Sequence, residues 1–159
     1  MKLNLGSEMT RYEGWLNVDF NPICKPDYVA DVRNLPFEDN SIDEIFASHV
    51  LEHTALKDNV LKEWERVLKP NRKIIIAVPD LLQSIALYRA GMFGLEYFLM
   101  TIYGGKEMGL DEKSHTHYQV FTSDMLLEQM RIYFKGVEIN NESPRPGNYG
   151  EVMAKGYKK

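Results

Sequence analysis

The feature that most constrains the fold is the run Ile74-Ile75-Ile76-Ala77-Val78, five apolar residues with no polar one among them. A strand with one face in water alternates apolar and polar side chains, so an unbroken run predicts a strand covered on both faces. Six further short apolar runs occur along the chain, at 3–5, 15–20, 28–32, 44–48, 137–139 and 150–154. Stretches with helical spacing separate several of them. This alternation is typical of an α/β domain with a largely parallel sheet.

The clearest helical pattern is Leu56–Leu68, which Pro70 is expected to end. Its apolar residues recur at helical spacing on one side, and its charged residues fall on the other. Trp64 lies in the apolar stripe. We therefore expect Trp64 to be buried against the sheet and to have no role in function.

Three more helices are expected in the second half of the chain. Asp80 and Thr122 are suitable N-caps for two of them, because their side-chain oxygens can accept hydrogen bonds from free backbone N–H groups. Residues 95–102 show a third apolar face. We expect most of the methionine and aromatic side chains of 92–103 to pack in the core, and the remainder to cover an acceptor pocket or form a dimer contact.

The connection between the first two strands is unusually short. Only residues 7–14 separate them, fewer than the dozen that a parallel crossover with its own helix needs. We expect this crossover to be a loop or a single helical turn. The expected fold is thus a mostly parallel α/β sheet with a shortened first crossover, which argues against a complete doubly wound fold.

Composition restricts the class of protein. The 159 residues are 44% apolar and 26% charged, which predicts one globular domain over 1–159. The net charge of −4 comes without a basic stripe, which argues against a nucleic-acid partner. No apolar run approaches the ~18 residues of a membrane span, and the first residues lack the apolar core of an export signal. Cys24 is the only cysteine, so no internal disulfide can form. We expect a cytoplasmic monomer or homodimer.

Three polar or glycine positions follow strands in the predicted sheet: Gly6, Asp19 and Asp31. Open α/β sheets bind ligands at the carboxyl ends of their strands, where a glycine allows close approach and a carboxylate accepts bonds from ribose hydroxyls. An ordinary turn glycine and two solvated aspartates are the alternative interpretation. The glycine-rich dinucleotide fingerprint is absent after Gly6, which argues against a nicotinamide or flavin dinucleotide.

Three segments in order carry a resemblance to a known family: ADVRNLPFEDNSID at 30–43, SHVLEH at 48–53 and ERVLKP at 65–70. Together they resemble the class I, S-adenosylmethionine-dependent methyltransferases. The likeness is greatest to a small bacterial and archaeal group found near glycan-biosynthesis enzymes, and it runs from about residue 3 to 80. It implies a Rossmann-like methyltransferase sheet.

The resemblance also implies S-adenosylmethionine as the cofactor and assigns residues to it. Gly6 would line the methionine moiety and Asp19 would bind ribose. Asp31 and Val32 would lie by the adenine. The implied cofactor-binding residues are Gly6, Ser7, Asp19, Phe20, Asp31, Val32 and Ser48. The sequence departs from the family at two positions. Glu8 replaces a usual second glycine, and Asn71-Arg72 replaces two glycines after the proline.

Three histidines are candidates for the acceptor side of the site: His49, His115 and His117. Methyl transfer is an in-line displacement, so catalysis needs positioning and a base for the acceptor proton. Imidazole titrates in the range that suits such a base. His49 follows the strand 44–48, and the other two lie in a loop before a capped helix, where the alternative is simple packing on the sheet edge.

The expected function is methyl transfer to an O or N nucleophile on a small or glycan-like acceptor. One alternative is a non-catalytic cofactor-binding module with the same fold, its site eroded by Glu8. Another is a zinc hydrolase, because His49-Val50-Leu51-Glu52-His53 fits the pattern H-x-x-E-H. That motif needs two histidines one turn apart on a helix, and His49 falls where a strand ends. We expect no metal site.

Overall fold

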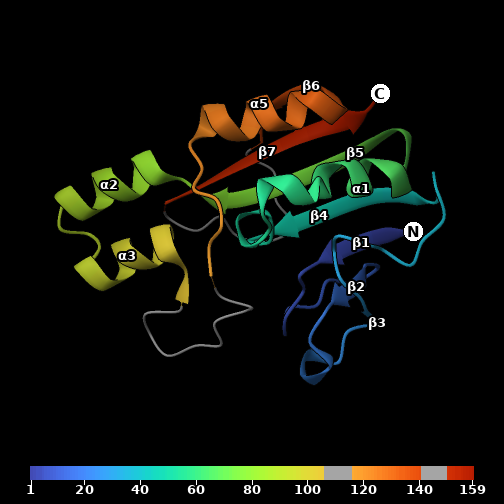
Figure 1. Ribbon diagram of the computed structural model, residues 1–159, viewed down its shortest axis with the longest axis horizontal. Helices are drawn as coiled ribbons and strands as arrows, with labels where there is room; N and C mark the ends of the chain where they lie inside the picture. The colour runs from blue at the N-terminus through green and yellow to red at the C-terminus, as the bar shows by residue number, and fades with distance from the viewer. Residues whose placement is uncertain (106–115, 141–149) are drawn as a thin grey trace.

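The computed structural model describes residues 1–105, 116–140 and 150–159 of the chain. A seven-stranded sheet has the order β3-β2-β1-β4-β5-β7-β6 (Figure 1). Strands β1 to β5 run parallel, and β7 runs antiparallel to both of its neighbours. The strands are β1 Lys2–Leu5, β2 Leu16–Asp19, β3 Tyr28–Val29, β4 Ile42–Ser48, β5 Leu68–Pro79, β6 Phe134–Ile139 and β7 Glu151–Lys158. The predicted, mostly parallel α/β sheet is confirmed.

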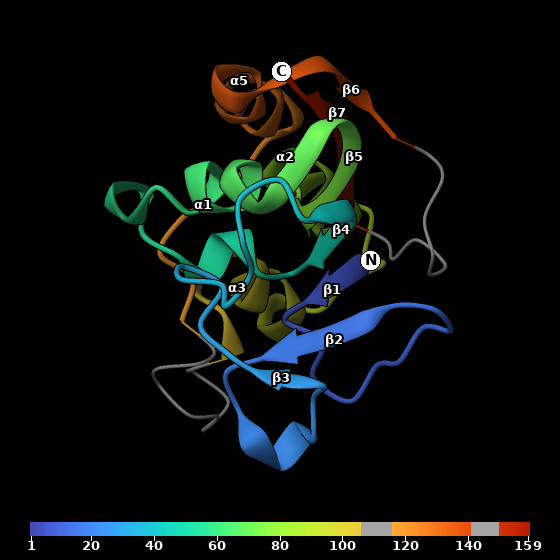
Figure 2. The same cartoon turned by 90° about the vertical axis from the view of Figure 1, so that its right-hand side faces the viewer.

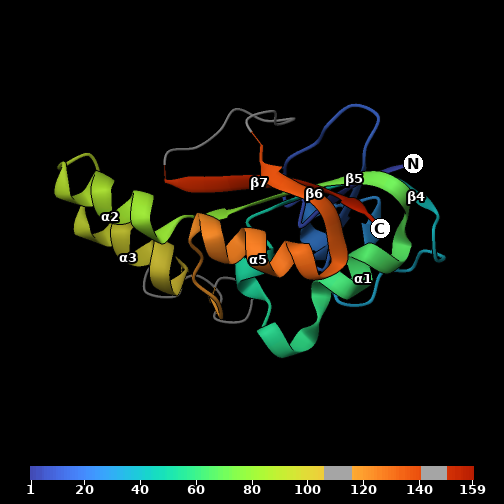
Figure 3. The same ribbon diagram turned by 90° about the horizontal axis from the view of Figure 1, so that it is seen from above.

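Of the helices in the described residues, the two that cover the sheet, at 60–67 and 123–133, lie on the same side of it (Figures 2 and 3). The helices are α1 Val60–Val67, α2 Leu81–Arg89, α3 Leu95–Tyr103 and α5 Ser123–Tyr133, with short 3-10 turns η1 Pro22–Cys24, η2 Leu51–His53 and η3 Leu56–Asp58. Both predicted caps are confirmed. The Asp80 carboxylate accepts from two N–H groups at the start of α2, and the Thr122 hydroxyl accepts from one in α5. None of the helices described combines the length and the apolar character that a bilayer crossing requires.

The predicted helix over Leu56–Leu68 is shorter in the structure. Asn59 has a left-handed backbone, with φ of 50°, and this residue divides the 3-10 turn η3 from α1. A left-handed residue cannot continue an α-helix, and asparagine tolerates this conformation better than most residues. The helix therefore begins at Val60, and the chain enters β5 directly at Leu68.

The main core lies between the sheet and the helices α1 and α5. Trp64 of α1 has no exposed surface, and its indole Nε1 donates to the Val32 carbonyl oxygen at 3.0 Å. Leu126 and Met130 of α5 complete the cover over the other half of the sheet. The predicted burial of Trp64 is confirmed.

The second face of the sheet carries no helix in the described residues. A small cluster forms there around Phe46 and Ile75, with the rings of Tyr12 and Trp15 packed against it. The Tyr12 and Trp15 rings meet the Phe46 ring edge to face, with centroids 5.9 and 6.4 Å away. Ile75 is only 3% exposed, so the unbroken run of β5 is covered on both faces as predicted.

Charged side chains continue this second face. Lys2, Glu44 and Lys73 are neighbours on β1, β4 and β5, and both lysine ammonium groups lie 2.9 Å from the glutamate oxygens. The residues that alternate with them along these strands point into the main core. The sheet thus has one apolar face under helices and one mixed face.

The short first crossover explains why none of the described helices lies on the second face. Residues between β1 and β2 form turns without a helix, as the sequence predicts. A standard crossover would place a helix over the second face, and its loss leaves Tyr12 and Trp15 to cover Phe46.

One prediction about packing was wrong. We expected the apolar side chains of 92–103 to lie mostly in the core, but none of them is buried. The helices α2 and α3 form a hairpin that projects beyond the ends of the strands (Figure 1), where no other element of the described residues forms a layer over it. The rings of Tyr88 and Phe98 stack on each other with centroids 5.0 Å apart.

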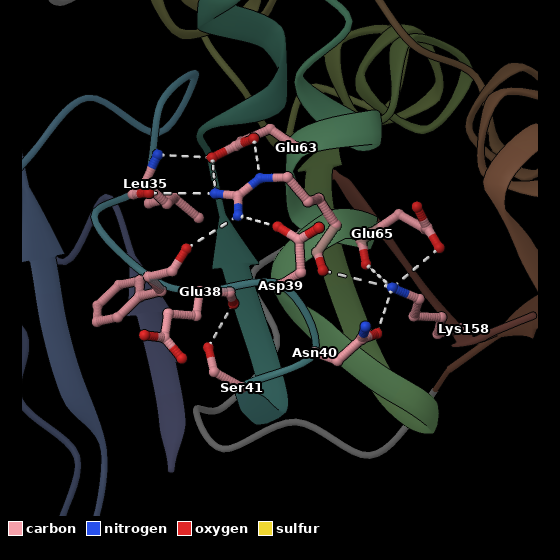
Figure 4. Close-up of polar contacts among 10 residues, drawn as sticks. Leu35, Glu38, Asp39, Asn40, Ser41, Glu63, Glu65 and Lys158 are labelled. Carbon is pink, nitrogen blue, oxygen red and sulfur yellow. Dashed lines mark hydrogen bonds and ion pairs between the residues drawn. The ribbon is translucent and has the colours of Figure 1, made fainter.

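The family-like segments around 35–41 and 63–70 are joined by a polar network centred on Arg66 (Figure 4). Its guanidinium donates to the Glu63 carboxylate, the Asp39 carboxylate and the carbonyl oxygens of Phe37 and Leu35. The neighbouring Lys158 ammonium donates to the Glu65 carbonyl at 2.7 Å. Much of the family-like pattern therefore holds the loop before β4 against α1.

We expect Arg66→Met to lower the free energy of unfolding by about 2–3 kcal/mol. The change removes charge-assisted bonds, worth about 1.5–3 kcal/mol each before relaxation, and leaves two carboxylates without their cation. Urea unfolding followed by circular dichroism measures this. Arg72→Met is the control, because Arg72 is exposed and 3.7 Å from its partner Asp43, so its loss should cost under about 0.5 kcal/mol. Equal effects of the two changes would contradict the structural role of the network.

Candidate active site

The predicted cofactor residues lie along one edge of the sheet. Because β1, β2, β3 and β4 are parallel and adjacent, their carboxyl ends fall side by side. Asp31 follows β3, Asp19 closes β2, Gly6 and Ser7 follow β1, and Ser48 closes β4. The fold therefore brings together residues that are up to 42 positions apart, from Gly6 to Ser48, at the edge where α/β sheets bind ligands.

Gly6 is required here by its surroundings. Its φ is +61°, and an added Cβ would lie 2.3 Å from the Val50 Cγ2 atom. A side chain is thus excluded both by backbone conformation and by contact. The structure supplies a packing reason for this glycine, in addition to the close ligand approach expected from sequence.

Ser7 follows in the same turn and is 3% exposed. Its N–H donates to the Val18 carbonyl at 3.2 Å, which ties the turn to β2. Its hydroxyl oxygen is buried and has no hydrogen-bond partner among the described residues. A buried hydroxyl without a partner is costly, so this atom fits a position that a ligand completes.

Both departures from the family occur at left-handed residues. Glu8 has φ of 44°, and Asn71 has φ of 61°. Glycine adopts such angles without strain, which accounts for the family preference. Here the turns keep the left-handed conformation with other residues, and the Glu8 side chain is exposed.

The Asp19 carboxylate binds the loop that follows β1 and the loop that follows β2. Asp19 is 4% exposed, and its two carboxylate oxygens accept from the Glu8 N–H and the Asn21 N–H, both at 2.8 Å. Each carboxylate oxygen has a second lone pair, so the group can still accept hydrogen bonds from hydroxyl groups of a ligand. Phe20 beside it is exposed.

Asp31 and Val32 follow β3 at the outer end of the row. The Arg33 guanidinium bonds the Asp31 carboxylate, with Nη2 2.6 Å from Oδ2, and this pairing lowers the pKa of Asp31. The Val32 carbonyl accepts the Trp64 indole bond. These two residues are thus held by α1 and by their own loop, and their predicted place beside adenine stays a prediction.

His49 directly follows β4 and has a left-handed backbone conformation, with φ of 55°. Its Nε2 lies 2.9 Å from the Glu151 carboxylate, and its Nδ1 lies 3.2 Å from the Glu52 carboxylate. Burial opposes a charge on this imidazole, but the two carboxylates outweigh burial and raise the pKa of His49 to about 9. At neutral pH the ring is therefore protonated and cannot accept a further proton.

His117 lies at the same edge, although it comes from a distant segment. The Tyr118 and Gln119 N–H groups donate to the Glu52 carbonyl, which fixes this segment beside η2. The His117 ring meets the His53 ring edge to face, with centroids 4.7 Å apart. Burial lowers the pKa of His117, so this imidazole is neutral at pH 7. His115, the third candidate, lies outside the described residues.

The sequence analysis did not select Glu52, His53 or Glu151 as site residues. Glu52 is 1% exposed and lies between the two candidate histidines. The signal that pointed to it was the H-x-x-E-H pattern. The two histidines of that pattern have different partners in the structure. His49 contacts Glu52 and Glu151, whereas His53 packs on His117.

Comparison with known proteins agrees with this geometry. Residues 10–76 match a family model described as a methyltransferase domain. The sterol 4-C-methyltransferase strm-1 of Caenorhabditis elegans is 38% identical over 64 residues, which are 40% of this chain and 19% of that protein. The chain spans between 3% and 19% of the length of the curated relatives it matches.

Solved structures show the same fold over the whole chain. A methyltransferase from Archaeoglobus fulgidus superposes with a TM-score of 0.68 at 15% identity, covering 99% of this chain and 85% of that one. One from Thermotoga maritima gives 0.66 at 18% identity, covering 99% and 82%. The chain thus has the Rossmann-like methyltransferase fold, and its residues 10–76 are similar to the methyltransferase-domain family. This family implies S-adenosylmethionine as the cofactor.

Proposed function

We propose that this chain transfers the methyl group of S-adenosylmethionine to an O or N nucleophile of a small-molecule acceptor. The cofactor would lie along the carboxyl ends of β1 to β4. Gly6, Ser7 and Ser48 would face its methionine part, Asp19 with Phe20 its ribose, and Asp31 with Val32 its adenine. Bound there, the cofactor supplies an electrophilic methyl group.

The observation that carries this proposal is the junction of the first two strands. The Asp19 carboxylate is fixed by two backbone N–H groups, so it needs no rearrangement before accepting ribose hydroxyls. The Ser7 hydroxyl beside it is buried without a partner in the described residues. A carboxylate already oriented to accept hydrogen bonds and a hydroxyl without a partner, both at the carboxyl ends of neighbouring strands, fit a polar nucleoside ligand.

The histidines would serve the acceptor side. A base must be unprotonated, and of the two candidates in the described residues only His117 meets this condition at neutral pH, because burial lowers its pKa. His49, whose pKa is about 9, would instead donate a hydrogen bond or stabilise negative charge. His115 stays a prediction as an alternative base.

The acceptor itself is proposed only as a class. A glycan-like acceptor stays a prediction of the sequence resemblance. The curated relative named above is a sterol 4-C-methyltransferase, and its name gives no support to a glycan acceptor. The alternative of a non-catalytic module rests on Glu8, which occupies a left-handed position normally held by glycine.

Calorimetric titration with S-adenosylmethionine and with its demethylated product tests the proposal. We expect the parent protein to bind both, and Ser7→Ala to weaken binding about two- to tenfold, the worth of one hydrogen bond of ~0.5–1.5 kcal/mol. Its thermal stability should not fall, because the hydroxyl removed has no partner within the described ranges. Ser84→Ala is the matched control. Its hydroxyl is equally buried but lies in α2, near the Gly150 carbonyl, so affinity should not change.

Absence of binding in the parent would contradict the proposed function and favour the eroded module. Binding that Ser7→Ala and Ser84→Ala leave equally unchanged would keep the cofactor but overturn the assignment of Ser7.

A further inference from the structure

Three side chains at the acceptor end of the site lie close enough to share one ligand. A carboxylate oxygen of Glu52 and one ring nitrogen each of His53 and His117 lie within 4.8 Å of one another. Ligands of a single cation at about 2.0–2.2 Å are separated by at most about 4.4 Å. Small side-chain rotations would therefore bring the three atoms to bonding positions.

Both imidazoles already have the hydrogen bonds that metal-binding histidines use. The Nδ1 atom of His53 lies 3.0 Å from the Thr116 carbonyl oxygen, and the Nδ1 atom of His117 lies 3.3 Å from the Thr101 carbonyl oxygen. A carbonyl oxygen only accepts, so each Nδ1 carries the hydrogen. The free lone pair then lies on Nε2 in both rings. The hydrogen bonds to backbone carbonyl oxygens fix the orientation of the two rings.

Glu52 supplies the negative charge. Its side chain is 1% exposed, and neither carboxylate oxygen accepts a hydrogen bond from the described residues. The His49 imidazole 3.2 Å from Oε1 is its ion-pair partner. A buried carboxylate with so few partners is costly to hold, and a cation would satisfy it.

We propose that Glu52, His53 and His117 together bind a divalent first-row transition cation such as Zn²⁺. Two imidazole nitrogens and one carboxylate oxygen suit Zn²⁺ or its neighbours, whereas Mg²⁺ and Ca²⁺ prefer oxygen ligands alone. Three protein ligands leave a coordination position open. This differs from the expectation of no metal, because the third ligand comes from the segment 116–119 and not from His49.

The open position gives the site a use that rests on the proposed function. An acceptor hydroxyl bound to the cation would lose its proton more easily, so a free histidine base would not be needed. In that case His117 acts as a ligand and not as the base. The acceptor class would then be a small molecule with an oxygen nucleophile able to bind the cation.

The metal alone tests this inference. We expect the parent, freed of metal with chelator, to bind one equivalent of Zn²⁺ in a calorimetric titration, and Co²⁺ to give a ligand-field absorption spectrum of bound metal. His117→Ala should weaken Zn²⁺ binding by more than the roughly 10–100-fold caused by loss of an outer hydrogen-bond partner. His49→Gln is the control and should retain binding. The H-x-x-E-H hydrolase interpretation predicts the opposite for these two variants.

A second measurement needs no variant. In long-range imidazole ¹⁵N spectra of the parent, Zn²⁺ should shift the Nε2 signals of His53 and His117 far more than the His49 signals, because His49 contacts the metal site only through Glu52. No stoichiometric binding, or unchanged signals from His117, would overturn the inference. Because the titrations contain no cofactor, their failure leaves the methyltransferase proposal standing. A protein that binds Zn²⁺ but no S-adenosylmethionine contradicts the methyltransferase proposal alone.

Discussion

Trp64→Ala is expected to lower the free energy of unfolding by about 3–5 kcal/mol. The side chain has no exposed surface and lies in the centre of the main core, so its removal leaves a large cavity between α1 and the sheet. It also leaves the Val32 carbonyl without its indole donor. Such a loss is a large share of the total stability of a domain of this size. Urea unfolding followed by far-ultraviolet circular dichroism gives the value.

The chain offers its own control in the second tryptophan. Trp15 is only half buried and lies on the second face with Tyr12 and Phe46. Trp15→Ala should therefore cost clearly less than Trp64→Ala. If Trp64→Ala unfolds at the same urea concentration as the parent, the core between α1 and the sheet has been described wrongly.

The second large effect is expected at Asp19. Asp19→Ala leaves two N–H groups, of Glu8 and Asn21, without their acceptor, at about 1.5–3 kcal/mol for each charge-assisted bond. If the carboxylate also accepts ribose hydroxyls, as proposed, affinity for S-adenosylmethionine should fall about tenfold or more. Calorimetry measures the affinity, and urea unfolding measures the stability.

A matched variant separates these two effects. The Asp27 carboxylate accepts from the backbone N–H and the side-chain amide of Asn17, at 2.7 and 2.8 Å, near the opposite end of β2. Asp27→Ala should thus loosen the same strand while cofactor affinity is kept, at a smaller cost in stability because Asp27 is exposed. Equal loss of affinity in both variants would show that loosening of β2, and not a ribose contact, weakens binding.

The sequence predicted features that depend on neighbours along the chain. Asp80 and Thr122 are caps because their side chains reach N–H groups two or three residues ahead. The strand at 74–78 and the absence of a helix after Gly6 also follow from local composition and length. The start of α1 escaped prediction because a single left-handed residue, Asn59, decides it.

The site was predicted where strand ends define it and missed where distant segments meet. Asp19 closes a strand, which its sequence context indicates. Glu52 is buried because the segment at Tyr118 and Gln119 folds back onto its carbonyl oxygen, and no spacing in the sequence reports that contact. For the same reason the partner of His53 is His117, although the H-x-x-E-H pattern suggested His49.

In the part of the chain that the structure describes, no helix covers the second face, and this has a consequence for how the strands align. On β4, Glu44 faces outward and Ile45 faces the core, and Lys2 and Lys73 are paired with Glu44 on the neighbouring strands. A slip of β4 by one residue would exchange the two faces and place the glutamate under the helices. Burying that charge away from both lysines costs several kcal/mol. A sheet that is apolar on both faces lacks this penalty, so the loss of one layer makes the correct alignment of the central strands more strongly preferred.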